Sequence, residues 1–426
     1  MKRDVDQPSR ERVSNADLAV LAMDRPSAPE QFAVVLVLGP GFDVAEGMRV
    51  LGERVRRIPR LRQCLVRVRG RAFWAPDPVF DPARHMYKLR CRLPGNERAL
   101  LEAAMPEFKR WLRRDRPLWR AVFVTGVEED RTALVLVVHH ALVDGLGGLA
   151  LLRRLFDQAE PTEESTPAPG DDDRGWWRGL RDAMAAGGGL FPGGVAPSSL
   201  LRPTGRRRRA VAAHADLAAV QETARRSGAT VNAAVLVAVG EALRRLLAHR
   251  GERVTEIRVG VPVAGDRTGA GNAVSPLLLT VPVTGCKEDR MARVTAATRA
   301  GRHRAAGPAP ISLLGGAFRL FAATGGYRWY MNHQRRLHIV ISCLRGPDHL
   351  VNLAGVTVRS MIPVVPGGSS NLTLSCQALS YAGSLTVTAV ADPARCPDLD
   401  LFARNLQNEL DLMSGRSTSG HRRARA

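Results

Sequence analysis

The chain has 426 residues, of which 45% are hydrophobic and only 5% aromatic, so its cores must be built from leucine, valine and alanine. This length exceeds the ~250–300 residues at which a single core stops growing, and it predicts two lobes. The six cysteines are scattered without a C-x-x-C pair, which speaks against a metal site and against a disulfide framework.

The net charge of +21 is carried almost wholly by arginine and attracts anionic lipids, nucleic acid and phosphate-bearing cofactors. Nucleic acid is the least favoured partner, because no helix-turn-helix, zinc or RNA-binding signature accompanies the charge. A solvated arginine-rich surface is the simplest alternative. The amino terminus is charged, and no apolar stretch reaches the ~18–20 residues of a membrane-spanning helix. We therefore expect a cytoplasmic protein without a signal peptide, whose membrane contact is at most peripheral.

Residues 1–156 are predicted to form one α/β lobe. Asp43 caps a helix that Pro59 ends, and the capping box with Glu46 supports its start. A second helix is predicted over 97–113, where Pro106 should introduce a kink or a break. The predicted strands lie at 64–68, 72–74, 121–125 and 133–138.

Residues 157–209 differ in composition from the rest of the chain. Prolines, glycines, an acidic run at 171–173 and four arginines at 206–209 predict a crossover linker that is partly disordered. Trp176 and Trp177 begin a short amphipathic segment that packs either on the body of the protein or against lipid.

Residues 210–413 are predicted to form a second lobe, and residues 414–426 a basic disordered tail. One helix follows Asp216 and stops at Gly228, and Thr230 caps another that is apolar nearly all round and therefore buried. Further strands are predicted at 257–262, 277–283, 338–342, 356–362, 372–376 and 385–391, with a closing helix at 399–412.

The most informative segment follows the apolar strand at 133–138 and reads HHALVDG from His139 to Gly145. Leucines then recur at helical spacing, so the two histidines stand where a strand passes into a helix, a place where α/β folds open their pockets. A neutral imidazole, with an ordinary pKa of ~6.5, is suited to act as a general base. The alternative is a buried histidine that is bonded only to a backbone carbonyl.

This HHxxxDG string is typical of the CoA-dependent acyltransferase superfamily, which includes chloramphenicol acetyltransferase and peptide-synthetase condensation domains. Further segments narrow the resemblance to bacterial wax ester synthase/acyl-CoA:diacylglycerol acyltransferases. They are RPLW at 116–119, GATVN at 228–232, VPV at 261–263, GP at 346–347 and SYAG at 380–383. The resemblance runs from about residue 14 to about residue 413. It implies a two-lobed α/β (α+β) fold of the chloramphenicol acetyltransferase type, with an active-site channel between the lobes.

The resemblance also implies an activity. Proteins of this family move a long acyl chain from acyl-CoA to diacylglycerol or a fatty alcohol and give triacylglycerol or wax ester. Acyl-CoA is then a co-substrate, no cofactor or metal is permanently bound, and a membrane or lipid-body surface is the expected partner. His140 is implied to be the general base, Asp144 to hold its loop, His139 to flank it and Gly145 to serve the tight turn.

Four more residues are candidates for the site. Arg267 occupies the place of a family arginine and would pair with Asp144, because a buried carboxylate needs a cation; an ordinary surface arginine is the equal alternative. Asn232 and Asn272 match family asparagines and either line the channel or cap and turn the backbone. Trp119 is interpreted as a structural residue that anchors the following strand in the core.

The sequence departs from the family pattern at several positions. Ala233 replaces an aspartate, Cys343 and Arg345 stand in a segment that usually reads Asn-Val-Pro-Gly-Pro, and an amino-terminal histidine is replaced near Phe32. Two alternatives therefore stay open: the same chemistry on a polyketide or amine acceptor, and a catalytically silent relative that binds lipid surfaces. The oligomeric state is not predicted.

Overall fold

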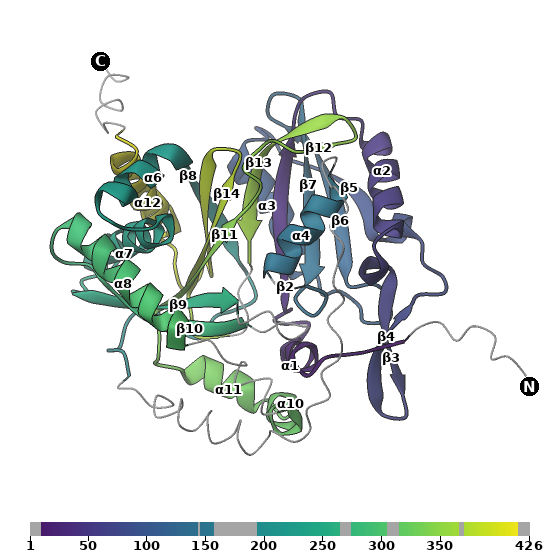
Figure 1. The fold of residues 1–426 in the computed structure, drawn as a ribbon, viewed down its shortest axis with the longest axis horizontal. Coiled ribbons are helices and arrows are strands. Elements are labelled where there is room, and N and C mark those ends of the chain that lie inside the picture. The colour runs from purple at the N-terminus through teal and green to yellow at the C-terminus, as the bar shows by residue number, and fades with distance from the viewer. Residues whose placement is uncertain are drawn as a thin grey trace, which may run out of the picture.

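The computed structural model describes residues 10–143, 145–156, 194–264, 274–304, 315–365 and 370–415. Two six-stranded sheets stand side by side, and helices pack on them (Figure 1). Residues 157–193 of the predicted linker, which include its tryptophans at 176 and 177, and nearly all of the predicted tail lie outside the described residues. The division into domains at 156, 209 and 413 therefore stays a prediction.

The first sheet carries the histidine pair. Its strands, in sheet order, are β12 (Asn352–Leu353), β13 (Val356–Val364), β2 (Gln31–Leu38), β7 (Arg131–His139), β6 (Trp119–Val127) and β5 (Met86–Arg90). Its helices are α1 (Asn15–Met23), α2 (Val44–Arg56), α3 (Glu97–Lys109) and α4 (Gly145–Leu155). A small sheet of β1 (Glu11–Arg12), β4 (Arg71–Pro76) and β3 (Gln63–Val68) adjoins it, with the short helices η1 (Pro59–Arg62) and η2 (Pro82–His85).

The second sheet has the order β10 (Val274–Pro282), β9 (Glu256–Ala264), β11 (Ile339–Arg345), β14 (Leu374–Tyr381), β15 (Ser384–Ala391) and β8 (Arg209–Asp216). Helices α6 (Leu217–Arg226), α7 (Val231–His249), α8 (Lys287–Arg304) and α12 (Leu399–Met413) belong to this half. The amide of Ala233 donates to Thr230 Oγ1 over 3.2 Å and caps α7, whose apolar residues are buried nearly all round, as the sequence predicted. Two further helices, α10 (Gly315–Ala323) and α11 (Gly326–His333), lie at the lower edge of Figure 1.

The two sheets are joined because a segment from the second half of the sequence forms strands of the first sheet. β13, from the second half of the sequence, pairs antiparallel with β2 of the first sheet. The Tyr381 hydroxyl, at the end of β14 in the second sheet, accepts from the amide of Val351 over 2.9 Å and donates to the carbonyl of Val358 over 2.8 Å. Because this tyrosine is 3% exposed, its two hydrogen bonds tie the sheets together through the core.

Most of the predicted elements are confirmed, with shifts at their ends. The helix predicted over 97–113 continues through Pro106 and ends at Lys109, where the amide of Arg110 bonds to the Pro106 carbonyl. Among the elements without a prediction, β2, β5 and β8 complete the two sheets, while α1, α8, α10 and α11 are helices. All six cysteines are free thiols. Among the described residues, no helix is long and apolar enough to cross a membrane, and no group of three or more histidine, cysteine or acidic side chains could hold a metal ion.

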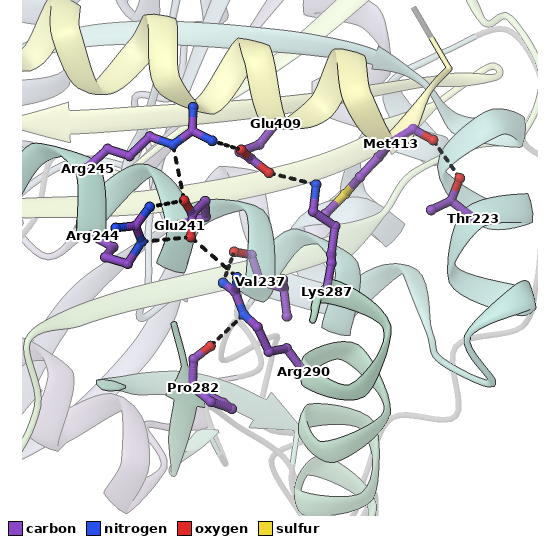
Figure 2. Close-up of polar contacts among 10 residues, drawn as sticks. All are labelled: Thr223, Val237, Glu241, Arg244, Arg245, Pro282, Lys287, Arg290, Glu409 and Met413. Atoms are coloured by element: carbon purple, nitrogen blue, oxygen red, sulfur yellow. Dashed lines mark hydrogen bonds and ion pairs between the residues drawn. The ribbon is translucent and has the colours of Figure 1, made fainter. Parts of the chain in front are cut away.

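A cluster of charges joins α7, α8 and α12 (Figure 2). Glu241 on α7 pairs with Arg244, Arg245 and Arg290, and its side chain is 9% exposed. Glu409 on α12, which is 2% exposed, pairs with Arg245 over 2.7 Å and with Lys287 over 2.8 Å. Burial by itself would raise the pKa of Glu241, but the hydrogen bonds from Arg244 and Arg245 outweigh it and lower the pKa to about 2.

We predict that Glu241→Gln lowers the free energy of unfolding at pH 7 by about 2–3 kcal/mol, because it leaves Arg290 without its buried carboxylate. Since the folded-state pKa is depressed, the difference between the two proteins should shrink as the pH falls from about 4.5 towards 2. Urea unfolding as a function of pH measures both effects. The matched control, Glu46→Gln at the exposed pair with Arg49, should leave stability unchanged. Equal losses in the two variants would contradict the role of the cluster.

Candidate active site

The end of β7 presents the histidine pair. The strand is buried from Thr132 to His139 and pairs with β2, so that Gln31 lies opposite His139. The amide of His140 then donates to the Glu30 carbonyl over 3.0 Å, and the amide of Leu142 donates to the His139 carbonyl over 2.9 Å. The chain therefore turns within three residues of the strand end, and α4 begins at Gly145.

His139 is a supporting residue rather than an exposed group. Its side chain is fully buried, and its Nδ1 accepts from the amide of Ala141 over 3.0 Å, so in the neutral ring the hydrogen sits on Nε2. Nε2 lies 3.4 Å from Asp24 Oδ2, and this carboxylate also accepts from Trp111 Nε1 over 2.7 Å. Although burial would raise the pKa of Asp24, the contacts with His139 and Trp111 lower it to about 2.

His140 packs on Phe32, with 4.9 Å between the ring centroids. Burial, and next the electrostatic interaction with His139, lower the pKa of His140 to about 4. The imidazole is therefore neutral at physiological pH and retains the lone pair that a general base requires. Gly148 of α4 lets the helix approach, since a Cβ at that position would lie 2.9 Å from Phe32 Cζ.

Glu30 is a second titratable group at this place, and no sequence motif points to it. Its backbone carbonyl holds the amide of His140, and its own amide donates to Asp24 Oδ1 over 3.0 Å. Burial, and to a lesser degree the charge of Asp24, raise the pKa of Glu30 to about 7. Burial and the charge of Glu30 in turn raise the pKa of Tyr327 on α11, so the second half of the chain also reaches this site.

The remaining predicted residues are spread over several places. Trp119 is 1% exposed, its Nε1 donates to the Leu61 carbonyl over 2.8 Å, and it stacks on His85, so it is a structural position in β6. Asn232 lies in the first turn of α7, and its Oδ1 is buried without a hydrogen-bond partner in the described part of the chain. Asp144, Arg267 and Asn272 lie outside the described residues, so their roles stay predictions.

One departure from the family pattern touches the histidine pair, because Phe32 packs on His140; Ala233, Cys343 and Arg345 lie in the second half of the chain. Ala233 is fully buried in α7, where it packs in the second core. Cys343 lies in β11, and burial raises the pKa of its thiol to about 12, which makes it a poor nucleophile. Arg345 ends the same strand and is exposed.

Comparison with solved structures defines the class of protein. The fold matches a wax ester synthase/diacylglycerol acyltransferase from Marinobacter aquaeolei VT8 with a TM-score of 0.69 and 19% identity, covering 95% of this chain and 100% of that one. The first condensation domain of the calcium-dependent antibiotic synthetase matches with a TM-score of 0.64 and 19% identity, over 96% and 97% of the two chains. The chain therefore has the two-lobed fold shared by these acyltransferases and condensation domains, as predicted.

The sequence comparisons narrow the class to a family. The wax ester synthase/diacylglycerol acyltransferase catalytic domain matches residues 13–178, and the C-terminal domain of the same family matches residues 270–414. A probable diacylglycerol O-acyltransferase, tgs1 of Mycobacterium tuberculosis (strain H37Rv), is 29% identical over 88% of this chain and 89% of its own length. The chain belongs to the wax ester synthase/diacylglycerol acyltransferase family.

We predict that the acid limb of kcat/KM lies below pH 5.5, because burial lowers the pKa of His140 to about 4. The measurement is the pH dependence of acyl transfer for the unaltered protein and for Glu30→Gln. Any inflection near pH 7 that disappears in Glu30→Gln belongs to Glu30, whose pKa is raised to about 7. A limb at the ordinary histidine value of about 6.5 in both proteins would contradict the burial of His140.

Proposed function

We propose that this protein transfers a long acyl chain from acyl-CoA to a lipid alcohol, diacylglycerol or a fatty alcohol, with His140 as the general base. The observation that carries the proposal is the neutral imidazole of His140 at the end of β7, in a member of an acyltransferase family. The relatives named as diacylglycerol O-acyltransferases support the same conclusion.

The chemistry needs one base and two oriented substrates. His140 takes the proton of the alcohol hydroxyl while the oxygen attacks the carbonyl carbon of the thioester. The carbon–sulfur bond then breaks, the imidazolium returns the proton to the leaving thiolate, and the products are an ester and free CoA. General base catalysis contributes a factor of ~10²–10⁴, and the alignment of both substrates contributes more. No acyl-enzyme is required, so no serine or cysteine nucleophile is assigned.

The neighbouring residues are proposed as supports of this base. His139, fixed between the Ala141 amide and Asp24, holds the end of β7 in place. Asp144 is proposed to hold the loop that follows, with Arg267 as its partner, and Gly145 to permit the turn. The orphaned Oδ1 of Asn232 supports a role in lining the channel, because a buried amide without a partner is costly unless a substrate satisfies it. Asn272 is proposed to act in the same way.

The co-substrate is acyl-CoA, and no permanently bound cofactor or metal is part of the proposal. A starter condensation domain solved in complex with C8-CoA has a TM-score of 0.62 and 14% identity to this chain. The same likeness supports the alternative of a polyketide or amine acceptor, but the family match and the named relatives favour a lipid alcohol. Because of the charge of +21, we propose that the protein works in the cytoplasm at an anionic membrane or a lipid inclusion.

We predict that His140→Ala lowers turnover of palmitoyl-CoA about a thousandfold, because it removes the base. Release of free thiol, followed with diacylglycerol, hexadecanol and an amine as acceptors, measures the loss and identifies the acceptor. The matched control is His249→Ala, at an exposed histidine that ends α7, and it should retain full activity. Comparable turnover in the two variants would refute the assignment of the base. If the unaltered protein released no thiol with any of the three acceptors, the catalytically silent relative would be favoured.

A further inference from the structure

Helices α10 and α11 form a corner at the edge of the molecule where β2 begins and β7 ends (Figure 1). The inner side of α10 packs on α1, where Phe318 and Ala322 are buried together with Ala19. α11 is held by the amide of Asn371, which donates to the Met331 carbonyl over 3.0 Å. Within the part of the chain that the structure describes, these contacts fix both helices to the body of the protein.

The outer side of the corner is apolar. Leu320 is 67% exposed, Phe321 45% and Trp329 65%, and these three side chains lie within ten positions of one another on two adjoining helices. Among the described residues, the other large apolar side chains with comparable exposure are scattered: Val79, Leu93, Leu350 and Leu412. A single exposed apolar residue is ordinary, whereas a group of this size marks an interaction surface.

The segment that carries the corner has charge of one sign. The segment between Asp289 and Asp348 contains ten arginines and no acidic residue. Arg328 and Arg335 are exposed, and Arg319 lies on α10 beside Leu320. Arg25, from the segment after α1, donates to the carbonyl of Ala322 over 3.1 Å and adds a further exposed cation at the end of α10. A partner for this surface must offer negative charge at its face and an apolar layer beneath it.

Anionic lipid has both properties. Tryptophan and the long apolar side chains insert at the boundary between head groups and acyl chains, while arginine meets the phosphates. The position of the corner fits this partner, because the charge of Glu30, whose carbonyl holds His140, acts on Tyr327 of α11. A bilayer against the corner would therefore lie on the side of the molecule where β7 ends and the proposed base stands.

We propose that Leu320, Phe321, Trp329 and the surrounding arginines form the surface by which this protein docks on an anionic lipid membrane. That docking brings the enzyme to its acceptor rests on the proposed function, whereas the docking surface itself does not. The α10–α11 corner then serves as the contact that keeps the reaction at the interface where the acceptor is dissolved.

Vesicle co-sedimentation of the full chain tests the proposal, using phosphatidylcholine vesicles with and without phosphatidylglycerol. The unaltered protein should bind only the anionic vesicles, and binding should weaken as salt is added. Arg319→Gln/Arg328→Gln should weaken binding about thirtyfold, since each cation near the surface contributes about a factor of five. Leu320→Ser/Trp329→Ser should weaken it at least about tenfold.

Two control variants match these changes elsewhere on the surface. Val79→Ser/Leu93→Ser removes exposed apolar side chains, and Arg84→Gln/Arg92→Gln removes exposed charges from the first half; both should bind as the unaltered protein does. All variants should keep their unfolding temperature and their activity on a soluble short-chain alcohol. Equal binding by corner and control variants, or no binding of anionic vesicles at all, would overturn the proposal. If the unaltered protein bound the anionic vesicles as expected but did not turn over the soluble alcohol, the result would contradict the proposed function and leave the docking surface supported.

Discussion

The site depends on the way in which the end of β7 is held. The strand is stopped by backbone bonds to its neighbours, and the Glu30 carbonyl fixes the amide of His140 while Asp24 lies beside the ring of His139. One imidazole is thereby a buried support, and the other packs on Phe32 and is neutral at physiological pH.

The rest of the fold maintains this arrangement. β2 pairs with β7, and α1 ends next to Asp24. Residues 15–38 are therefore needed to hold a histidine pair that lies about a hundred positions further along the chain. β13 enters the same sheet from the second half, and Tyr381 ties the two sheets through the core. The cluster of Glu241 and Glu409 stabilises the helices behind the second sheet. Each lobe therefore contributes to the geometry of the site, although the base belongs to the first.

The sequence predicted the histidine pair and its strand–helix junction because both are local features. The same was true of α7, whose cap at Thr230 and apolar run are contiguous. β8 was missed because its alanine-rich sequence has little β-propensity, and α8 because its apolar residues are few. β2 contains an unbroken apolar run of seven residues, 32–38, which periodicity does not distinguish from a buried helix.

The surroundings of the base could not be predicted for a different reason. Asp24, Glu30 and Tyr327 come to His139 and His140 through strand pairing and helix packing across long stretches of chain. A single acidic residue before an apolar run, such as Glu30, does not indicate a site until the pairing of its strand with the neighbouring strand is known. The α10–α11 corner is similar, because its composition is visible in the sequence but the exposure of Leu320 and Trp329 follows only from the packing of α10 on α1.

The central claim is that the buried end of β7 keeps the His140 imidazole neutral. Nuclear magnetic resonance of protein labelled with ¹³C at histidine Cε1, with the His140 signal assigned by its absence in His140→Ala, tests this most directly. With the pKa of the ring lowered to about 4, we expect no shift of the size that imidazole protonation produces between pH 8 and pH 5.5. A signal that titrates near the ordinary value of about 6.5 would show that the ring is solvated and would contradict the account.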